Sequence, residues 1–114
     1  MSALVDGLDE FAAVLAAALP IRVTRDPAVA IPPCVLLDTP TVTGRTLRAF
    51  TVEVPVYLVG SGPGDKKTGD DMLVNLPDLM IAANVVESQP RPITIGEITY
   101  PAMTIVATVT IAKE

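Results

Sequence analysis

Hydrophobic and polar positions alternate along residues 102–112, near the C-terminal end of the chain. Successive side chains of a strand point to opposite faces, so this period of two predicts one long strand. One face is apolar and typical of a core; its members are Met103, Ile105, Ala107, Val109 and Ile111. The other face is rich in threonine and carries no ionised group; its members are Thr104, Val106, Thr108 and Thr110. Because a face that only meets water usually carries charge, we expect another part of the protein, or another copy of it, to cover this surface.

The same alternation predicts a second strand over residues 50–59. Its predicted core face consists of Phe50, Val52, Val54, Val56 and Leu58, and its opposite face of Thr51, Glu53, Pro55, Tyr57 and Val59. Pro55 cannot donate a ladder hydrogen bond, which predicts that this strand lies at a sheet edge or is bulged there. An edge strand must be protected or paired, so this feature also suggests a neighbouring subunit.

Two segments repeat their apolar residues at helical spacing. The first covers residues 3–19, with Ser2 as the candidate N-cap and Pro20 as its end. Its apolar residues are Leu4, Val5, Leu8, Phe11, Ala12, Leu15 and Leu19. The second covers residues 71–87, and its apolar residues are Met72, Leu73, Leu76, Leu79, Met80, Ala83 and Val86. Pro77 predicts either a kink in this second helix or a main helix that begins near Leu76 with Pro77 in its first turn.

The remaining segments are short. Residues 21–24 could form a strand, and the apolar run 34–37 favours a buried strand, although so few residues leave a helix open. Residues 38–48 indicate either a long exposed hairpin loop or two strand ends with a mobile tip between them. Residues 60–70 indicate a loop, and residues 93–100 a tight hairpin. This order of elements predicts one α+β domain over residues 1–114, with two helices packed on an antiparallel or mixed β-sheet.

Composition and charge exclude several classes of function. The net charge is −5 and the basic residues form no stripe, which argues against a nucleic-acid binder. The chain has no histidine, so the commonest general base, the commonest zinc ligand and the usual nucleophile–base pairs are missing. The apolar runs are too short or too interrupted to span a membrane, and the first residues lack the basic start of a secretory signal.

Candidate chemistry is sparse. The glycine-rich stretch 60–68 follows a predicted strand and precedes a predicted helix, as a phosphate loop would. However, Asp65 stands between Gly64 and the lysines, and its carboxylate would repel a phosphate. Asp70 and Asp71 are better explained as charges at a helix N-terminus than as a metal pair. Cys34 lies in an apolar run and is best explained as a small core residue. Because each of these candidates has a simpler structural explanation, we expect no catalytic residue, no metal site and no cofactor.

Candidate interface residues fall into two groups. Arg45, Arg48, Lys66 and Lys67 lie in the two predicted loops, where they either form a solvated surface or pair with an acidic neighbour. Pro55, Tyr57, Thr104, Thr108 and Thr110 lie on the outer faces of the two long strands. Tyr57 and Tyr100 could stack on a ligand, but packing or interface contact is the commoner use of two tyrosines far apart in sequence.

The whole chain resembles the tail terminator proteins of long, non-contractile-tailed bacteriophages. The resemblance lies in the layout: an amphipathic N-terminal helix that ends at Leu19-Pro20, then a strand and a proline-marked link into residues 33–37. The long strand 50–59, the helix 71–87, the segment 93–101 and the final strand rich in threonine and valine complete it. The composition, low in aromatic residues and rich in alanine, valine, threonine and proline, is similar to that of phages of actinobacterial hosts.

This resemblance implies a tail-terminator-like fold and a structural protein of the virion, assembled in the host cytoplasm. Such proteins form a hexameric ring that caps the tail tube, stops its polymerisation and offers an attachment surface to the head and neck. The implied partners are further copies of the chain, the major tail tube protein and a head–neck or stopper protein. DNA would pass through the lumen without specific binding, and no membrane would be involved.

Three alternatives to a tail terminator remain. The chain could be another neck protein, such as a stopper or completion protein. It could be a small ligand- or peptide-binding α+β module, which would need an apolar pocket with a few convergent polar groups. An enzyme would need paired carboxylates in a cleft, and because the sequence offers no compelling pair we expect no enzymatic activity.

Overall fold

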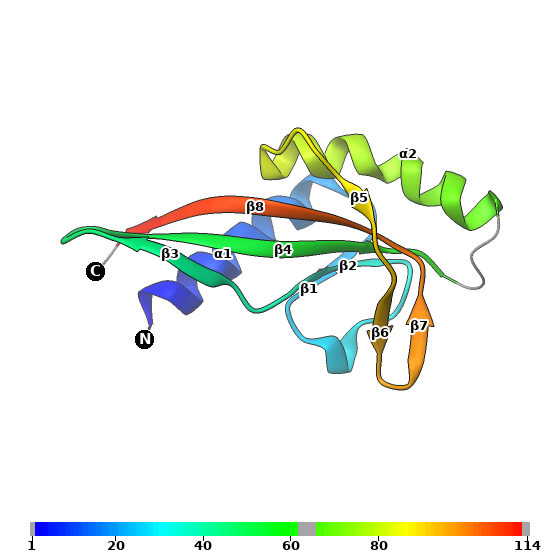
Figure 1. The fold of residues 1–114 in the computed structure, drawn as a ribbon, viewed down its shortest axis with the longest axis horizontal. Helices are drawn as coiled ribbons and strands as arrows, with labels where there is room; N and C mark the ends of the chain where they lie inside the picture. The colour runs from blue at the N-terminus through cyan, green and yellow to red at the C-terminus, as the bar shows by residue number, and fades with distance from the viewer. Residues whose placement is uncertain (1, 62–65, 113–114) are drawn as a thin grey trace.

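Two helices and a six-stranded sheet dominate the part of the chain that the computed structural model describes, residues 2–61 and 66–112 (Figure 1). The helices are α1 (Ala3–Ala18) and α2 (Lys66–Ala83), and a short 3₁₀ helix spans Pro27–Val29. The six strands are β1 (Arg22–Thr24), β2 (Cys34–Leu37), β3 (Thr41–Arg45), β4 (Ala49–Val59), β5 (Gln89–Pro90) and β8 (Ala102–Ala112). A separate hairpin consists of β6 (Ile93–Ile95) and β7 (Ile98–Tyr100). The predicted α+β class is confirmed.

The sheet is built around the long antiparallel pair β4 and β8. The two strands pair along eleven residues each, from Ala49 opposite Ala112 to Val59 opposite Ala102. The strand order is β1-β2-β4-β8-β5, and β3 pairs with the other end of β4, beyond β2. Only β1 and β2 run parallel among the described pairs, so the sheet is mixed. The molecule is elongated, with principal extents of 48 × 28 × 23 Å.

The main core lies between the sheet and the two helices. The predicted core face of β4 is fully buried from Val52 to Leu58, and Ile105, Ala107 and Ile111 of β8 are buried beside it. The helices contribute Leu8, Leu15, Leu76 and Leu79, all at positions predicted to face the core. The alternation of both strands is therefore confirmed on this side of the sheet.

A second, smaller core lies on the opposite face, at one end of the sheet only. Cys34, Leu36, Val59 and Ala102 are buried there, with Tyr57, Ile93, Ile95 and Tyr100 packed against them. In Figure 1 the β6–β7 hairpin hangs below this end of the sheet. The sheet is thus covered on both faces at one end and on one face at the other.

The helix ends follow local rules and correct the predicted bounds of α2. Ser2 is the N-cap of α1 as expected, since its Oγ accepts the Val5 N–H at 3.3 Å. Helix α2 runs over residues 66–83 rather than 71–87, and it continues through Pro77, so a start near Leu76 is wrong. Asn84 ends it with a positive φ of 56°, and the Val85 N–H reaches back to the Met80 carbonyl at 3.0 Å. This left-handed cap turns the chain away before it completes another turn.

Pro55 corrects the expectation of an edge strand. It lies in the middle of β4, which has strand neighbours on both sides, and its pairing with β8 is regular. The Pro55 carbonyl accepts the Asp38 N–H at 2.9 Å, so the missing Pro55 N–H faces the same side. Along that side β2 ends at Leu37 and β3 begins only at Thr41. The proline is tolerated in a central strand because it faces the gap between two shorter partners.

Residues 38–48 match the second of the two alternatives, two strand ends joined by a tip. Strand β3 pairs with β4 from Thr41 opposite Glu53 to Arg45 opposite Phe50. The register shifts between Val42 and Gly44, which marks a bulge in β3. Thr46 closes the turn, because its Oγ1 accepts the N–H groups of Arg48 and Ala49.

Candidate interaction surface

The uncovered half of the sheet presents the outer faces of β4 and β8 side by side. The register places Thr51 opposite Thr110, Glu53 opposite Thr108 and Pro55 opposite Val106. We call these six residues the threonine face. Thr108, Thr110, Val106 and Glu53 are exposed, and Thr51 and Pro55 are half-buried. Glu53 is its one ionised group.

Three predicted interface residues meet on the threonine face and two do not. Pro55, Thr108 and Thr110 lie on it. Tyr57 and Thr104 pair with each other at the covered end of the sheet, where Tyr57 packs in the second core. The Tyr57 hydroxyl also donates to Asp38 Oδ2 at 3.4 Å. Thr104 Oγ1 is buried with no hydrogen-bond partner among the described residues. Both side chains are half-buried and lie away from the threonine face.

The outer edge of β8 is open next to the threonine face. At its covered end the Arg91 N–H donates to the Ala102 carbonyl and the Ser88 hydroxyl to the Thr104 carbonyl. Backbone groups alternate sides along a strand, so the N–H and C=O groups of Val106, Thr108 and Thr110 point to this same outer edge. The described residues offer them no partner, because β5 pairs only with Met103 and Thr104.

This edge lacks the usual protection against pairing. Residues 105–112 contain no proline and no charged residue, and their ladder with β4 has no bulge. By contrast, β3, which lies on the other side of β4 from β8, has both a bulge and a charged residue, Arg45. Natural edge strands are kept apart by such devices, so β8 is the edge that is open to another strand.

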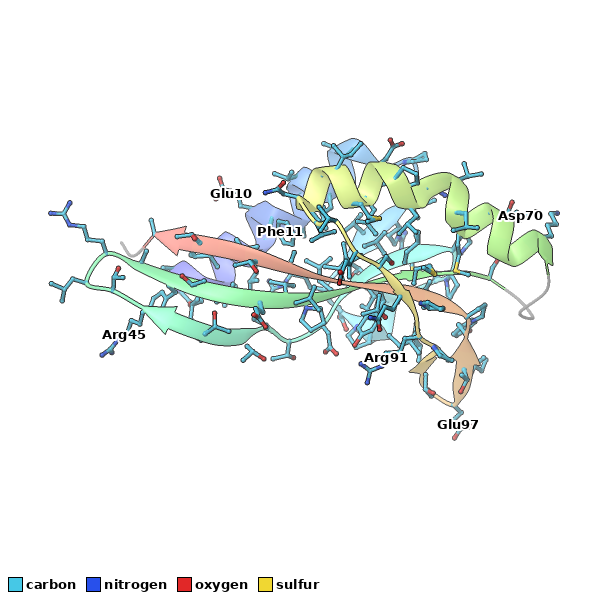
Figure 2. The ribbon with its side chains drawn as sticks, turned by 45° about the horizontal axis from the view of Figure 1, so that its top comes forward. Glu10, Phe11, Arg45, Asp70, Arg91 and Glu97 are labelled. Carbon is cyan, nitrogen blue, oxygen red and sulfur yellow. The ribbon has the colours of Figure 1, made fainter. Side chains whose placement is uncertain are left out.

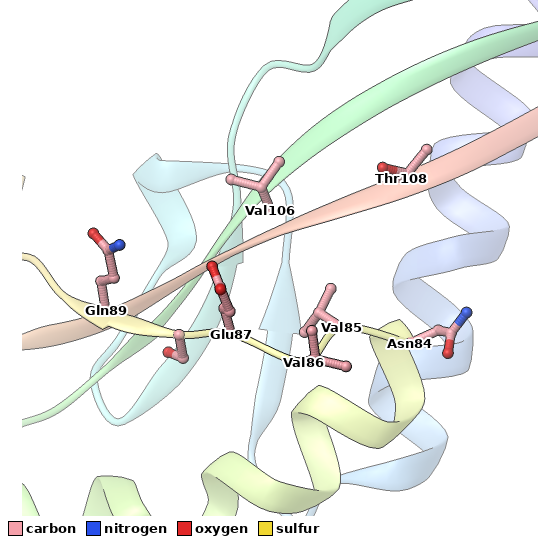
Figure 3. A pocket seen from close by; sticks show the side chains of 8 residues that line it. Asn84, Val85, Val86, Glu87, Gln89, Val106 and Thr108 are labelled. Atoms are coloured by element: carbon pink, nitrogen blue, oxygen red, sulfur yellow. The ribbon is translucent and has the colours of Figure 1, made fainter.

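A hollow of about 430 Å³ lies between the start of this edge and the segment that follows α2 (Figure 3). Val86 and Val106 line it, and their side chains are 93 % and 51 % exposed. Its spacing from Leu79 and Ala83 predicts that Val86 lies on the apolar face of a helix, which is wrong because the helix ends before it. Asn84, two residues earlier in the sequence, indicates the helix end, because asparagine is favoured in the left-handed conformation that ends a helix.

The four predicted basic residues do not form one patch. Arg45 and Arg48 are exposed at the β3–β4 turn, whereas Lys67 is exposed in the first turn of α2, at the opposite end of the long axis. Figure 2 shows this separation, with Arg45 and Asp70 at opposite ends of the molecule. Lys66 begins α2, and its side chain lies outside the described part. The ion pair that the described residues do form joins Arg25 to Asp9 on α1.

The candidate chemical groups lie apart from one another in the described part of the chain. No three side chains of the metal-ligating types come together there. Burial raises the pKa of the Cys34 thiol, and the positive charge of Arg22 opposes this more weakly. The phosphate-loop candidate lies partly outside the described residues, in positions 62–65, and Lys66 and Lys67 belong to α2.

Comparison with known proteins finds no similar protein. No protein-family model matches the chain, and neither the curated proteins nor the solved structures contain a significant match. Neither described helix is long and apolar enough to cross a membrane.

Proposed function

We propose that this protein is a self-associating structural subunit, and specifically a tail terminator that forms a ring on the end of a phage tail tube. One observation carries the proposal: β4 and β8 extend beyond the second core and leave a threonine face and an open β8 edge next to each other. A strand from a second copy could pair with the open backbone N–H and C=O groups of β8, and its sheet could cover the nearly uncharged threonine face. The proposed role is structural and not enzymatic, and it involves no cofactor.

The physical cost of covering this surface is low. Threonine methyl groups and Val106 gain from burial, and hydroxyl groups can be satisfied across a sheet face. Glu53 is the one group whose charge would need a partner or a place at the rim. The open backbone groups of β8 would exchange their hydrogen bonds with water for hydrogen bonds with another strand.

A contact between two different patches, repeated around an axis, closes into a ring when its rotation closes, and otherwise forms an open filament. The net charge of −5 suits a ring through which DNA passes, because like charges keep the DNA from sticking to the wall. The proposed partners are other copies of the chain, the tail tube below and a neck protein above. The proposed location is the virion, after assembly in the host cytoplasm.

The test measures assembly directly. Light scattering after size-exclusion chromatography gives the mass of the purified protein, and negative-stain electron microscopy shows its effect on tail tubes. We expect a ring-sized assembly, free or formed on tube ends, and tubes of uniform length in its presence. A protein that stays monomeric and never binds tube ends would contradict the proposal. Binding to isolated necks but not to tube ends would instead indicate a stopper or completion protein.

A small-ligand module is the second candidate, and one cavity favours it. A space of about 250 Å³ lies between the end of β4 and α2, with apolar walls from Leu58 and Met72 and polar groups from Asp71 and Asn75. Typical ligand pockets start at about 300 Å³, so this space would suit only a small molecule. A rise in melting temperature with one compound of a metabolite panel would support this candidate.

A further inference from the structure

The β3–β4 turn presents an apolar side chain between two arginines. Leu47 is 96 % exposed, more than any other large hydrophobic side chain in the described residues. Arg45 and Arg48 flank it and are also exposed, and neither forms an ion pair with a described residue. We call residues 45–48 the hairpin tip. The bulge in β3 bends the strand just before this tip.

A hollow of complementary character lies between α1 and the last residues of β8. Its volume is about 500 Å³, and we call it the α1 hollow. Phe11, Val14 and Ala3 give it an apolar wall, and the carboxylates of Asp6 and Glu10 stand beside them. Neither acid is paired with a cation among the described residues. Figure 2 labels Glu10 and Phe11 on the same helix, behind the sheet.

The two features cannot satisfy each other within one chain. Leu47 would be buried if it filled the hollow of its own chain, and its side chain is almost fully exposed. Among the described residues, each copy therefore leaves the hollow and its two acids without a partner, and leaves the leucine unburied between two arginines. Opposite charges around an apolar centre are typical of a specific contact between proteins.

We propose that the α1 hollow of one copy receives the hairpin tip of a second copy. This inference rests on the proposed self-association and names one contact within it, in addition to the threonine face. Leu47 fills the apolar part of the hollow, and Arg45 and Arg48 lie near Asp6 and Glu10. A tip and a hollow are different patches, so the contact has the form from which rings are built.

Two complementary variants test the contact. The tip variant is Leu47→Asp, and the hollow variant combines Glu10→Lys with Val14→Lys. We expect each variant alone to self-associate at least tenfold more weakly than the unchanged protein in sedimentation velocity. An equimolar mixture should form a 1:1 complex, because one partner supplies an intact hollow and the other an intact tip.

Ile98→Asp is the matched control, since Ile98 is 57 % exposed on the β6–β7 hairpin away from both patches. It should assemble like the unchanged protein. Circular dichroism and thermal unfolding check the fold of every variant. If a variant does not fold, Arg48→Glu and Glu10→Arg form a second complementary pair of surface changes.

The outcomes separate this inference from the proposed function. Unchanged assembly of both folded variants would overturn the tip-in-hollow contact and leave self-association standing. A mixture that stays monomeric would also overturn the contact. An unchanged protein that is monomeric at every concentration would overturn both proposals.

Discussion

At Gly7, α1 packs closely against the last residues of the sheet. A Cβ atom at this position would lie 2.6 Å from Cγ2 of Ile111 and 2.9 Å from its Cγ1. Alanine is the better helix former by about 1 kcal/mol, but overpacking a close contact costs about 1–3 kcal/mol. We expect Gly7→Ala to lower the free energy of unfolding, measured by urea titration.

Gly69 offers the matched control for this prediction. It lies in α2, and a Cβ there would have no atom within 4 Å. Gly69→Ala should therefore raise the free energy of unfolding by up to about 1 kcal/mol. If Gly7→Ala stabilised the protein equally, α1 would not pack on Ile111 as described.

Cys34 should be protected from thiol reagents by its burial. Its pKa is raised in the folded state, so the thiol stays protonated at a pH where an unfolded thiol, with an ordinary pKa of about 8.5, has ionised. We expect slow labelling by iodoacetamide at pH 8 and rapid labelling in denaturant, read by mass spectrometry. Fast labelling of the native protein would show that β2 is not buried.

The same pKa shift gives a pH dependence with a definite sign. Above the unfolded-state pKa the unfolded chain binds fewer protons than the folded one. The contribution of Cys34 to stability is therefore complete below about pH 8.5 and is lost as the pH rises toward the folded-state pKa. Cys34→Ala should reduce this alkaline loss of stability in urea titrations at pH 8 and pH 10.

At the scale of elements, Pro77 is the least favourable residue of α2. It lies inside the helix, is exposed, and cannot donate to the carbonyl of Leu73 one turn earlier. We expect Pro77→Ala to raise the free energy of unfolding by about 1–3 kcal/mol, again by urea titration. Pro20→Ala, just outside α1, should change it by less than about 0.5 kcal/mol. A loss of stability in Pro77→Ala would mean that the pyrrolidine ring of Pro77 makes stabilising contacts with neighbouring side chains.

The sequence predicts elements well where a pattern repeats. The alternation in β4 and β8 and the helical spacing in α1 identify these elements and their buried faces. The bounds of α2 are less predictable, since Val86 fits the helical spacing although the chain leaves the helix at Asn84. The two-residue strand β5 is missed because it is too short to show a period.

Pro55 shows a further limit of local rules. A proline excludes a ladder hydrogen bond on one side of a strand, and from sequence alone this indicates an edge or a bulge. The structure satisfies the rule differently, with two short strands that leave a gap at that position. The lengths and positions of neighbouring strands decide the outcome, and these are long-range properties.

The candidate surface depends even more on long-range pairing. Each strand reveals by itself which side chains share a face. Only the register between β4 and β8 brings Pro55 next to Val106 and Glu53 next to Thr108. It also places Tyr57 opposite Thr104 at the covered end of the sheet, away from the threonine face. The separation of the arginines from Lys67 depends on the whole fold in the same way.

At the scale of the whole molecule, the threonine face is testable by adding one charge. Thr108 is exposed near the centre of this face, so Thr108→Lys should leave the monomer folded. If the face is covered between copies, a buried lysine without a partner should weaken association by tenfold or more in sedimentation velocity. Thr99→Lys, an exposed change on β7, is the control. Ring formation unaffected by Thr108→Lys would show that this face remains in water.

The position of the second core gives the two ends of the sheet different properties. At one end, side chains shield the backbone from water on both faces, so amide hydrogens of β2 and the paired half of β4 should exchange slowly with deuterium. At the other end, β3 and the last residues of β8 are shielded on one face only and should exchange sooner. In the proposed ring, a subunit built in this way would keep a rigid end that fixes its shape, while the twist of its free end could adjust when a neighbour docks.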